Sequence, residues 1–254
     1  MRVEKLRSSS WLALLLALVL SGVRADALPA QSRQLILVVT PSWDAVQGTL
    51  HAYERRGTEW SARLDAPVSI GSKGSAWGVG LHESQEGPQK REGDGRSPAG
   101  MFSIGTAFGY ASSLPSGIAY QAMSEFDYCI DVDESPHYNR IVDARAVGRE
   151  AVEKSTEPMR RDIHVKGDQR YKVGFVIAHN PQGLASKGSC IFAHLWGHPG
   201  QTTAGCTAMN EQVMRELVAW LNGEAAPIFI LLPQAEYERL APQWELPRGV
   251  RAPQ

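Results

Sequence analysis

The sequence predicts a β-rich α+β fold, and three observations support this prediction. The 254 residues include 24 glycines and 15 prolines, a share that favours a loop-rich, strand-rich fold over a helical bundle. Several short apolar or alternating runs are bounded by turn residues, as strands usually are. One clear helix signature is present, and it begins at Asn210.

The predicted strands follow one another along the chain. Residues 34–39 are a branched apolar run that stops before Pro41, and residues 48–55 alternate between apolar and polar side chains. A turn at 56–57 then leads into residues 59–64, which continue the hairpin. The complete set of predicted strands is 34–39, 48–55, 59–64, 66–70, 128–132, 173–178, 189–195 and 227–232.

The predicted helix extends from Asn210 to about Gly223. Asn210 is a good N-cap, Glu211 suits the positive end of the helix dipole, and Gly223 suits a C-terminal stop. One apolar face is formed by Val213, Met214, Leu217, Trp220 and Leu221. Residues 71–80 and 90–100 are expected to be loops, and residues 143–161 show only weak helical periodicity.

The chain begins with a pattern that is typical of a secretory signal peptide, residues 1–25. Three basic residues precede the apolar run 11–20, and small residues follow it up to Ala25. The run is about half as long as a membrane span requires. We therefore expect an exported, soluble protein, periplasmic or secreted, that has no membrane contact after signal cleavage. One domain is expected over 33–233, followed by a loose tail at 241–254.

Composition excludes several classes of protein. Hydrophobic residues make up 43% of the chain and charged residues 21%, values of a globular protein rather than a disordered one. The formal net charge of -1 gives no indication of nucleic-acid binding. Oligomeric state is left open by the sequence.

The segment 188–209 contains the residue types that nucleophilic catalysis requires. Cys206 follows Gly205, and His194 lies twelve residues upstream, across a Gly/Pro-containing turn. A cysteine nucleophile needs a nearby base to become a thiolate, and His194 is placed to supply one. Gly205 permits a close backbone approach, so the amides of Gly205 and Cys206 are candidates for an oxyanion hole.

Two plainer interpretations apply to the same residues. A cysteine after a glycine is often a small buried residue, and a strand histidine is often structural. A zinc site is the second alternative, with ligands drawn from His179, Cys190, His194, His198 and Cys206. Their spacing matches no common zinc pattern.

Cys129 and Cys190 remain once Cys206 is set aside as the nucleophile. Export places them in an oxidising compartment, and both lie in strand-like stretches that become neighbours if the strands pair. A disulfide between them and a pair of buried apolar thiols are both open on the sequence.

Two blocks of the chain resemble the L,D-transpeptidase catalytic-domain family, the YkuD-like cell-wall enzymes. Thr203-Ala-Gly-Cys206 matches the family pattern of Ser/Thr-x-Gly-Cys, and His194 stands in the place of the family base. The block 90–105, with Gly-Asp-Gly, a proline and Gly-x-Phe, resembles a second family segment. The commonest signature has His and Arg where this chain has Ala204 and Ala208, so the chain resembles a divergent branch.

The resemblance implies a mixed β-sheet or sandwich domain and a cysteine acyltransferase that acts on peptidoglycan stem peptides. Cys206 then attacks a carbonyl at an L–D bond and forms a thioester, and His194 moves protons for the leaving and accepting groups. A backbone carbonyl within 195–197 is expected to orient the imidazole. The resemblance implies neither metal nor organic cofactor. The alternative function is a catalytically silent cell-wall or peptidoglycan-binding module of the same fold.

Other residues are weaker candidates for substrate contact. They are Thr203 and Thr207 beside the nucleophile, Asn139 and Arg140 in a possible lid, and His179 at a strand end. A surface loop explains residues 139–140 equally well, and a structural hydrogen bond explains His179 at least as well. Asp94 and Arg96 are better explained as a charged turn than as substrate contacts.

Overall fold

The computed structural model describes residues 27–253, so the predicted signal peptide lies outside the described residues. The strands are β1 (Gln34–Thr40), β2 (Gln47–Arg56), β3 (Glu59–Ser69), β4 (Ser75–Trp77), β5 (Ser97–Gly109), β6 (Tyr120–Ala122), β7 (Asp127–Cys129), β8 (Ile141–Asp143), β9 (Glu157–Pro158), β10 (Val173–Ile177), β11 (Phe192–Leu195), β12 (Thr207–Met209) and β13 (Ile228–Pro233). The helices are α1 (Ala144–Val147), α2 (Arg161–His164), α3 (Glu211–Trp220) and α4 (Gln234–Trp244), with 3-10 turns at Arg149–Ala151 and Gly223–Ala225.

The large sheet closes on itself. Its strands follow the order β10-β11-β12-β3-β2-β1-β13-β5-β4, and β10 also pairs with β5. The long strand β5 makes this closure possible, because its first part pairs with β13 and its later part with β10. Pairing is mixed: β1 with β13 and β11 with β12 are parallel, whereas the hairpin β2–β3 is antiparallel. The expected β-rich α+β fold with a mixed sheet is confirmed.

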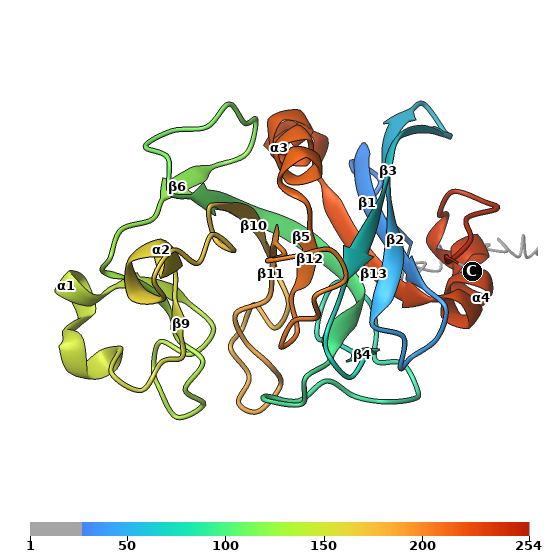
Figure 1. Ribbon diagram of the computed structural model, residues 1–254. Coiled ribbons are helices and arrows are strands. Elements are labelled where there is room, and N and C mark those ends of the chain that lie inside the picture. Colours follow the sequence, from blue (N-terminus) through green and yellow to red (C-terminus); the bar gives the residue numbers. More distant parts are fainter. Residues whose placement is uncertain (1–26, 254) are drawn as a thin grey trace, which may run out of the picture.

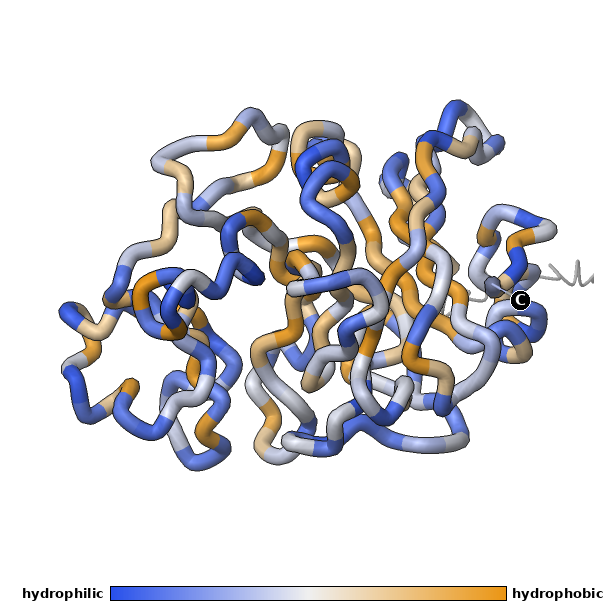
Figure 2. Tube along the Cα trace, viewed as in Figure 1, coloured by the Kyte–Doolittle hydropathy of each residue, from blue (hydrophilic) through white to orange (hydrophobic). Residues whose placement is uncertain are grey.

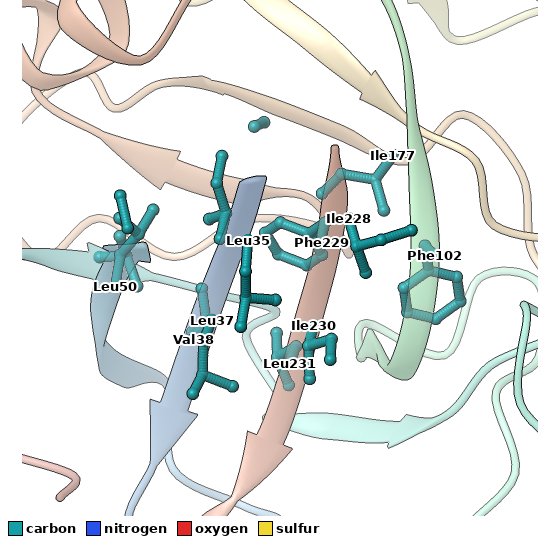
Figure 3. Close-up of a cluster of buried hydrophobic side chains, with 14 of the residues drawn as sticks. Leu35, Leu37, Val38, Leu50, Phe102, Ile177, Ile228, Phe229, Ile230 and Leu231 are labelled. Carbon is teal, nitrogen blue, oxygen red and sulfur yellow. The ribbon is translucent and has the colours of Figure 1, made fainter. Parts of the chain in front are cut away.

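The central strands β1 and β13 are buried along their whole length. Figure 3 shows their side chains packed with those of β2 and β5, among them Leu37, Leu50 and Phe102. A strand covered on both faces is expected to be a continuous apolar run, which explains why 34–39 and 227–232 are so readable in the sequence. Each fully buried Leu or Ile side chain contributes about 1.5–3 kcal/mol.

Helix α3 agrees with its sequence signature at its N-terminus. The Asn210 side chain accepts a hydrogen bond from the Val213 amide at 2.9 Å, as an N-cap does. The helix packs on β10 and β11, close to the strand that carries His194. It ends at Trp220, three residues before the glycine expected to stop it.

The expectation of a loose tail at 241–254 is wrong for the described residues. Helix α4 packs against β1 and β13 (Figure 1). The Trp244 side chain is 0% exposed. Leu246 and Val250, beyond the helix, belong to the same buried cluster. The apolar residues Tyr237, Leu240 and Trp244 lie on one helix face, and their burial extends the core beyond residue 233.

Residues 123–172 form a separate layer at one side of the large sheet, called here the side segment. It contains a three-stranded sheet in the order β8-β7-β9. Helices α1 and α2 lie in the same segment (Figure 1). The large sheet is mostly apolar along its strands, and the side segment carries many hydrophilic positions (Figure 2). Weak periodicity over 143–161 reflects this alternation of very short helices and strands.

Three other expectations need correction. Residues 59–64 and 66–70 form one strand, β3, rather than two. The loop expected at 71–80 contains β4, which pairs with the start of β5. The surface loop expected at 90–100 is partly internal, because the Lys90 side chain is 4% exposed. In residues 27–253, none of the helices has the length and apolarity that crossing a bilayer requires.

Candidate active site

Strand pairing brings the two expected catalytic residues together. β11 and β12 are parallel neighbours, with His194 opposite Ala208, and Cys206 lies immediately before β12. The Cys206 and His194 side chains line one cavity of about 130 Å³. The same cavity is lined by Thr203 and Ala204 of the loop that leads to the cysteine.

The His194 imidazole is held in one orientation. Its Nδ1 lies 2.7 Å from the Leu195 carbonyl oxygen, and the side chain is buried. Because a carbonyl only accepts, Nδ1 carries the proton and Nε2 keeps the lone pair that a base needs. The carbonyl lies within the range 195–197 expected from the sequence. Burial lowers the pKa of His194 to about 4, and the Leu195 hydrogen bond opposes this shift.

The Cys206 thiol is enclosed by its neighbours and is protonated at rest. Its residue is 8% exposed, the Phe192 amide donates to Sγ at 3.3 Å, and the thiol donates to the Cys190 carbonyl at 3.4 Å. Burial, together with the smaller effect of the Glu157 carboxylate, raises the pKa of Cys206 to about 12, and the Phe192 amide opposes this shift. The resting pair at neutral pH is therefore a neutral thiol and a neutral imidazole.

The loop before the nucleophile is fixed through the Cys206 carbonyl. The Thr203 hydroxyl donates to this oxygen at 2.6 Å and the Ser97 hydroxyl at 3.1 Å. The Gly205 amide donates to Thr203 Oγ1 at 3.1 Å, which engages the amide that we expected in the oxyanion hole. The Cys206 amide therefore remains the candidate oxyanion donor of the two. Gly205 has a packing role, since a Cβ there would lie 3.1 Å from the Arg96 carbonyl oxygen.

The block 90–100 is held by contacts among its own residues and with β4. The Lys90 ammonium pairs with Asp94 at 2.5 Å, and Asp94 also accepts from the Arg96 amide at 2.9 Å. The Arg96 guanidinium donates to the Ser75 carbonyl at 2.9 Å. These contacts are internal, so Asp94 and Arg96 form the charged turn that the sequence favoured.

The weaker substrate-contact candidates separate into two groups. Thr203 lines the cavity, and Thr207 is buried on β12 next to the nucleophile. Asn139, Arg140 and His179 lie outside the lining of this cavity. Asn139 donates to the His179 carbonyl at 2.9 Å and accepts from the Cys190 amide at 2.8 Å, and Arg140 is exposed.

His179 has a structural environment. Its Nδ1 accepts from the Val79 amide at 3.2 Å and its Nε2 donates to the Lys187 carbonyl at 2.8 Å. Burial lowers the pKa of His179 to about 4, so the ring is neutral. With both ring nitrogens engaged, His179 cannot act as the zinc ligand considered from the sequence. Across residues 27–253, no group of three or more His, Cys, Asp or Glu side chains is arranged to hold a metal ion.

A disulfide joins Cys129 of β7 to Cys190, just before β11. The Cα atoms are 5.9 Å apart, inside the range a disulfide needs, and Cys206 is the free cysteine. All three cysteines belong to one buried cluster. The bond therefore ties the side segment to the strand that carries His194, and Cys190 is unavailable to a metal.

The side segment supplies a wall of the cavity that the sequence did not indicate. Its lining residues are Thr156, Glu157, Arg161, Arg170 and Tyr171. The Tyr171 ring meets the His194 ring edge-on, with centroids 5.3 Å apart, and the Tyr171 hydroxyl donates to Glu157. Arg161 and Arg170 both bind Asp168. A Tyr, a Glu and two Arg in a polar stretch give no sequence signal of this placement.

The β-rich fold agrees with the family comparison. The family model for the YkuD L,D-transpeptidase catalytic domain matches residues 43–230, most of the chain. The chain therefore belongs to this family.

Similarity to solved structures is distant. The structure of Bd1075 from Bdellovibrio bacteriovorus aligns with a TM-score of 0.38 at 13% identity, covering 82% of this chain and 52% of that one. The helical cell shape determining protein Pgp2 from Campylobacter jejuni aligns with a TM-score of 0.39 at 12% identity, covering 79% and 48%. This chain spans about half the length of each. No curated protein matches the chain.

Proposed function

We propose that this protein is an exported, cysteine-dependent L,D-transpeptidase that acts on peptidoglycan stem peptides. The observation that carries the proposal is the shared cavity of Cys206 and His194, with the imidazole fixed by the Leu195 carbonyl. Membership of the family supplies the class of reaction. The Thr203 and Ser97 hydroxyls hold the loop before the nucleophile through its carbonyl.

The resting protonation states define the order of proton transfers. Because the thiol is neutral, its proton passes to His194 Nε2 as sulfur attacks the carbonyl of the L residue. The Cys206 amide donates to the oxygen that becomes negative. Protonated His194 then gives its proton to the leaving amine, and a thioester remains on Cys206. An amine acceptor or water releases the acyl group in the second half of the reaction.

Export supports the same proposal. Residues 1–25 have the composition of a signal peptide, and peptidoglycan lies outside the cytoplasmic membrane. The Cys129–Cys190 disulfide fits an oxidising compartment.

A second candidate function rests on the burial of the nucleophile. The Cys206 side chain is enclosed and its thiol donates to the Cys190 carbonyl rather than to His194. A peptidoglycan-binding module of the same fold with an unreactive thiol would have this arrangement.

Turnover of a synthetic stem tetrapeptide separates the two candidates. The wild-type protein should release the terminal D-amino acid, and Cys206→Ala should lower the rate by about three orders of magnitude or more. Cys206→Ala removes only the sulfur atom and its two weak hydrogen bonds, so its melting temperature should change little. Binding of the peptide without release by the wild-type protein would support the binding module, and full turnover by Cys206→Ala would overturn the cysteine mechanism.

A further inference from the structure

The cavity has two walls of different chemistry. One wall is the nucleophile loop with β11 and β12, and the other is the side segment with Glu157, Arg161, Arg170 and Tyr171. Both arginines on the second wall already have an anionic partner. Arg161 Nε lies 3.0 Å from Asp168, and Arg170 Nε lies 2.9 Å from the same carboxylate. The positive charges of both guanidinium groups are therefore largely neutralised by Asp168.

Glu157 is the acidic residue in the lining of this cavity. Its Oε2 accepts from the Tyr171 hydroxyl and lies 3.8 Å from Arg161 Nη1. Both contacts engage Oε2, and within the described residues no hydrogen-bond donor reaches Oε1. The carboxylate is held from one side by Tyr171 and retains acceptor capacity on the other oxygen.

The position of Glu157 affects the nucleophile. Glu157 and Cys206 line the same cavity, and the ionised Glu157 carboxylate raises the pKa of Cys206. In its ionised form Glu157 therefore opposes thiolate formation and offers nothing to the first attack. A cation bound beside Glu157 would relieve that repulsion, and the amine that accepts the acyl group is a cation in water.

We propose that Glu157 binds the ammonium group of the acceptor through Oε1 and directs the Cys206 thioester toward an amine rather than water. This inference rests on the proposed function and names the residue that binds its amine acceptor. Tyr171 is a positioning residue, because it acts through Glu157.

The step balances without any further reactant. The bound ammonium loses one proton through Glu157 to solvent, and the neutral amine attacks the thioester carbon. The C–N bond forms, the C–S bond breaks, and His194 Nε2 takes the second N–H proton and returns it to the departing Cys206 sulfur. The products are an amide, the free thiol and one released proton.

The test measures partition between two products. The purified protein turns over a synthetic stem tetrapeptide in the presence of Nα-acetyl-lysinamide, and mass spectrometry gives the ratio of amide product to hydrolysed product. Glu157→Gln should lower this ratio at least tenfold. Glu157→Asp should recover part of it. Tyr171→Phe should give a smaller loss, because the carboxylate remains.

Two controls keep the result specific. Glu153→Gln changes an exposed carboxylate of the same segment that lies outside the cavity lining, and it should leave the ratio unchanged. A carbapenem should still acylate Cys206 in Glu157→Gln, which shows that the nucleophile of this variant remains intact. If Glu157→Gln does not fold, the wild-type protein is tested with hydroxylamine, which is uncharged at neutral pH. The wild-type protein should prefer the lysine amine over hydroxylamine beyond their reactivities toward a free thioester.

The outcomes are distinguishable from failure of the proposed function. If the wild-type protein is neither acylated nor turns over peptide, the proposed function fails. If it turns over peptide and Glu157→Gln keeps the wild-type ratio, or if the wild-type protein yields hydrolysed product alone, the role of Glu157 is overturned. The absence of any preference for the charged amine over hydroxylamine would also overturn it.

Discussion

The closed sheet and the side segment meet at the Cys206 cavity, and their side chains are held there by different forces. In the sheet, His194 and Cys206 are placed by strand pairing, buried neighbours and bonds to the backbone. In the side segment, the wall residues are held by ion pairs around Asp168, by the Tyr171–Glu157 hydrogen bond and by a disulfide. Cys206 and His194 therefore lie among apolar strands. The facing wall of the cavity is a polar layer that is held by its own ion pairs and by the disulfide. Substitutions in the sheet should change the rate of the reaction. Substitutions in the side segment should change the choice between an amine and water as the acceptor.

The largest expected effect sharpens the chemical side of this comparison. His194→Asn removes the base and keeps a polar side chain, so turnover should fall by about 10²–10⁴-fold. His198→Asn changes an exposed histidine of the following loop and should leave turnover close to the wild-type value. Steady-state kinetics on the stem tetrapeptide measures both. Equal activity of the two variants would remove His194 from the mechanism.

The pH dependence of the free energy of unfolding is a second way to compare the sheet with the wall. The pKa values of His179 and His194 fall from 6.5 to about 4 in the folded protein, so the unfolded chain binds more protons between these values. Stability should therefore be fully present above pH 6.5 and decrease as the pH falls to 4, by at most about 3 kcal/mol for each histidine.

Glu157 changes the pH dependence of stability in the opposite direction. Burial raises its pKa, so the folded protein binds this proton more readily than the unfolded chain. Urea unfolding of the wild-type protein at pH 7 and pH 4.5 measures the sum, and we expect the histidines to dominate. A protein that is equally stable at both pH values would contradict the buried neutral state of these rings.

The disulfide is the covalent attachment between the two regions. It closes a loop with a sequence separation of 61, and the chain-entropy relation assigns it about 4 kcal/mol as an upper figure. The double variant Cys129→Ala, Cys190→Ala should lose about 2–4 kcal/mol in urea unfolding. Thiol titration of the denatured, unreduced wild-type protein should find one free thiol, and three would contradict the bond.

Ser97 tests the support of the nucleophile loop with the smallest expected effect. Its hydroxyl donates to the Cys206 carbonyl and accepts from the Gly71 amide at 2.9 Å, in a buried position. Ser97→Ala should cost about 1–3 kcal/mol of stability, because a buried donor and acceptor lose their partner. Ser103→Ala, on the exposed face of the same strand, should cost little. Similar costs for both variants would deny Ser97 this role.

The same two regions differ in how much the sequence could predict. Residues 34–39 and 227–232 are apolar because both faces of their strands are covered, and this pattern is visible locally. The shared cavity of Cys206 and His194 could also be anticipated, because both residues lie in one continuous segment. Glu157 and Tyr171 reach the cavity through chain topology and short polar contacts, which leave no periodic signal.

Two errors concern packing that the local pattern did indicate in part. The spacing of Tyr237, Leu240 and Trp244 is helical, yet Pro242 and the polar residues that follow suggested a loose tail. Lys90 looked like a surface residue because it is charged, and it is internal because Asp94 and the Arg91 carbonyl bind its ammonium. In both cases the residues are buried by a partner that the local pattern does not show. For helix α4 the partner is the sheet, and for Lys90 it is the turn that contains Asp94.

The proposed function requires that the Cys206 thiol, with His194 beside it, forms a covalent acyl-enzyme. Intact-mass spectrometry of the purified protein after incubation with a carbapenem tests this most directly. We expect a single covalent adduct that peptide mapping locates on Cys206, absent in Cys206→Ala and formed much more slowly in His194→Asn. A wild-type protein that stays unmodified, or an adduct located on another residue, would overturn the role of Cys206 as nucleophile.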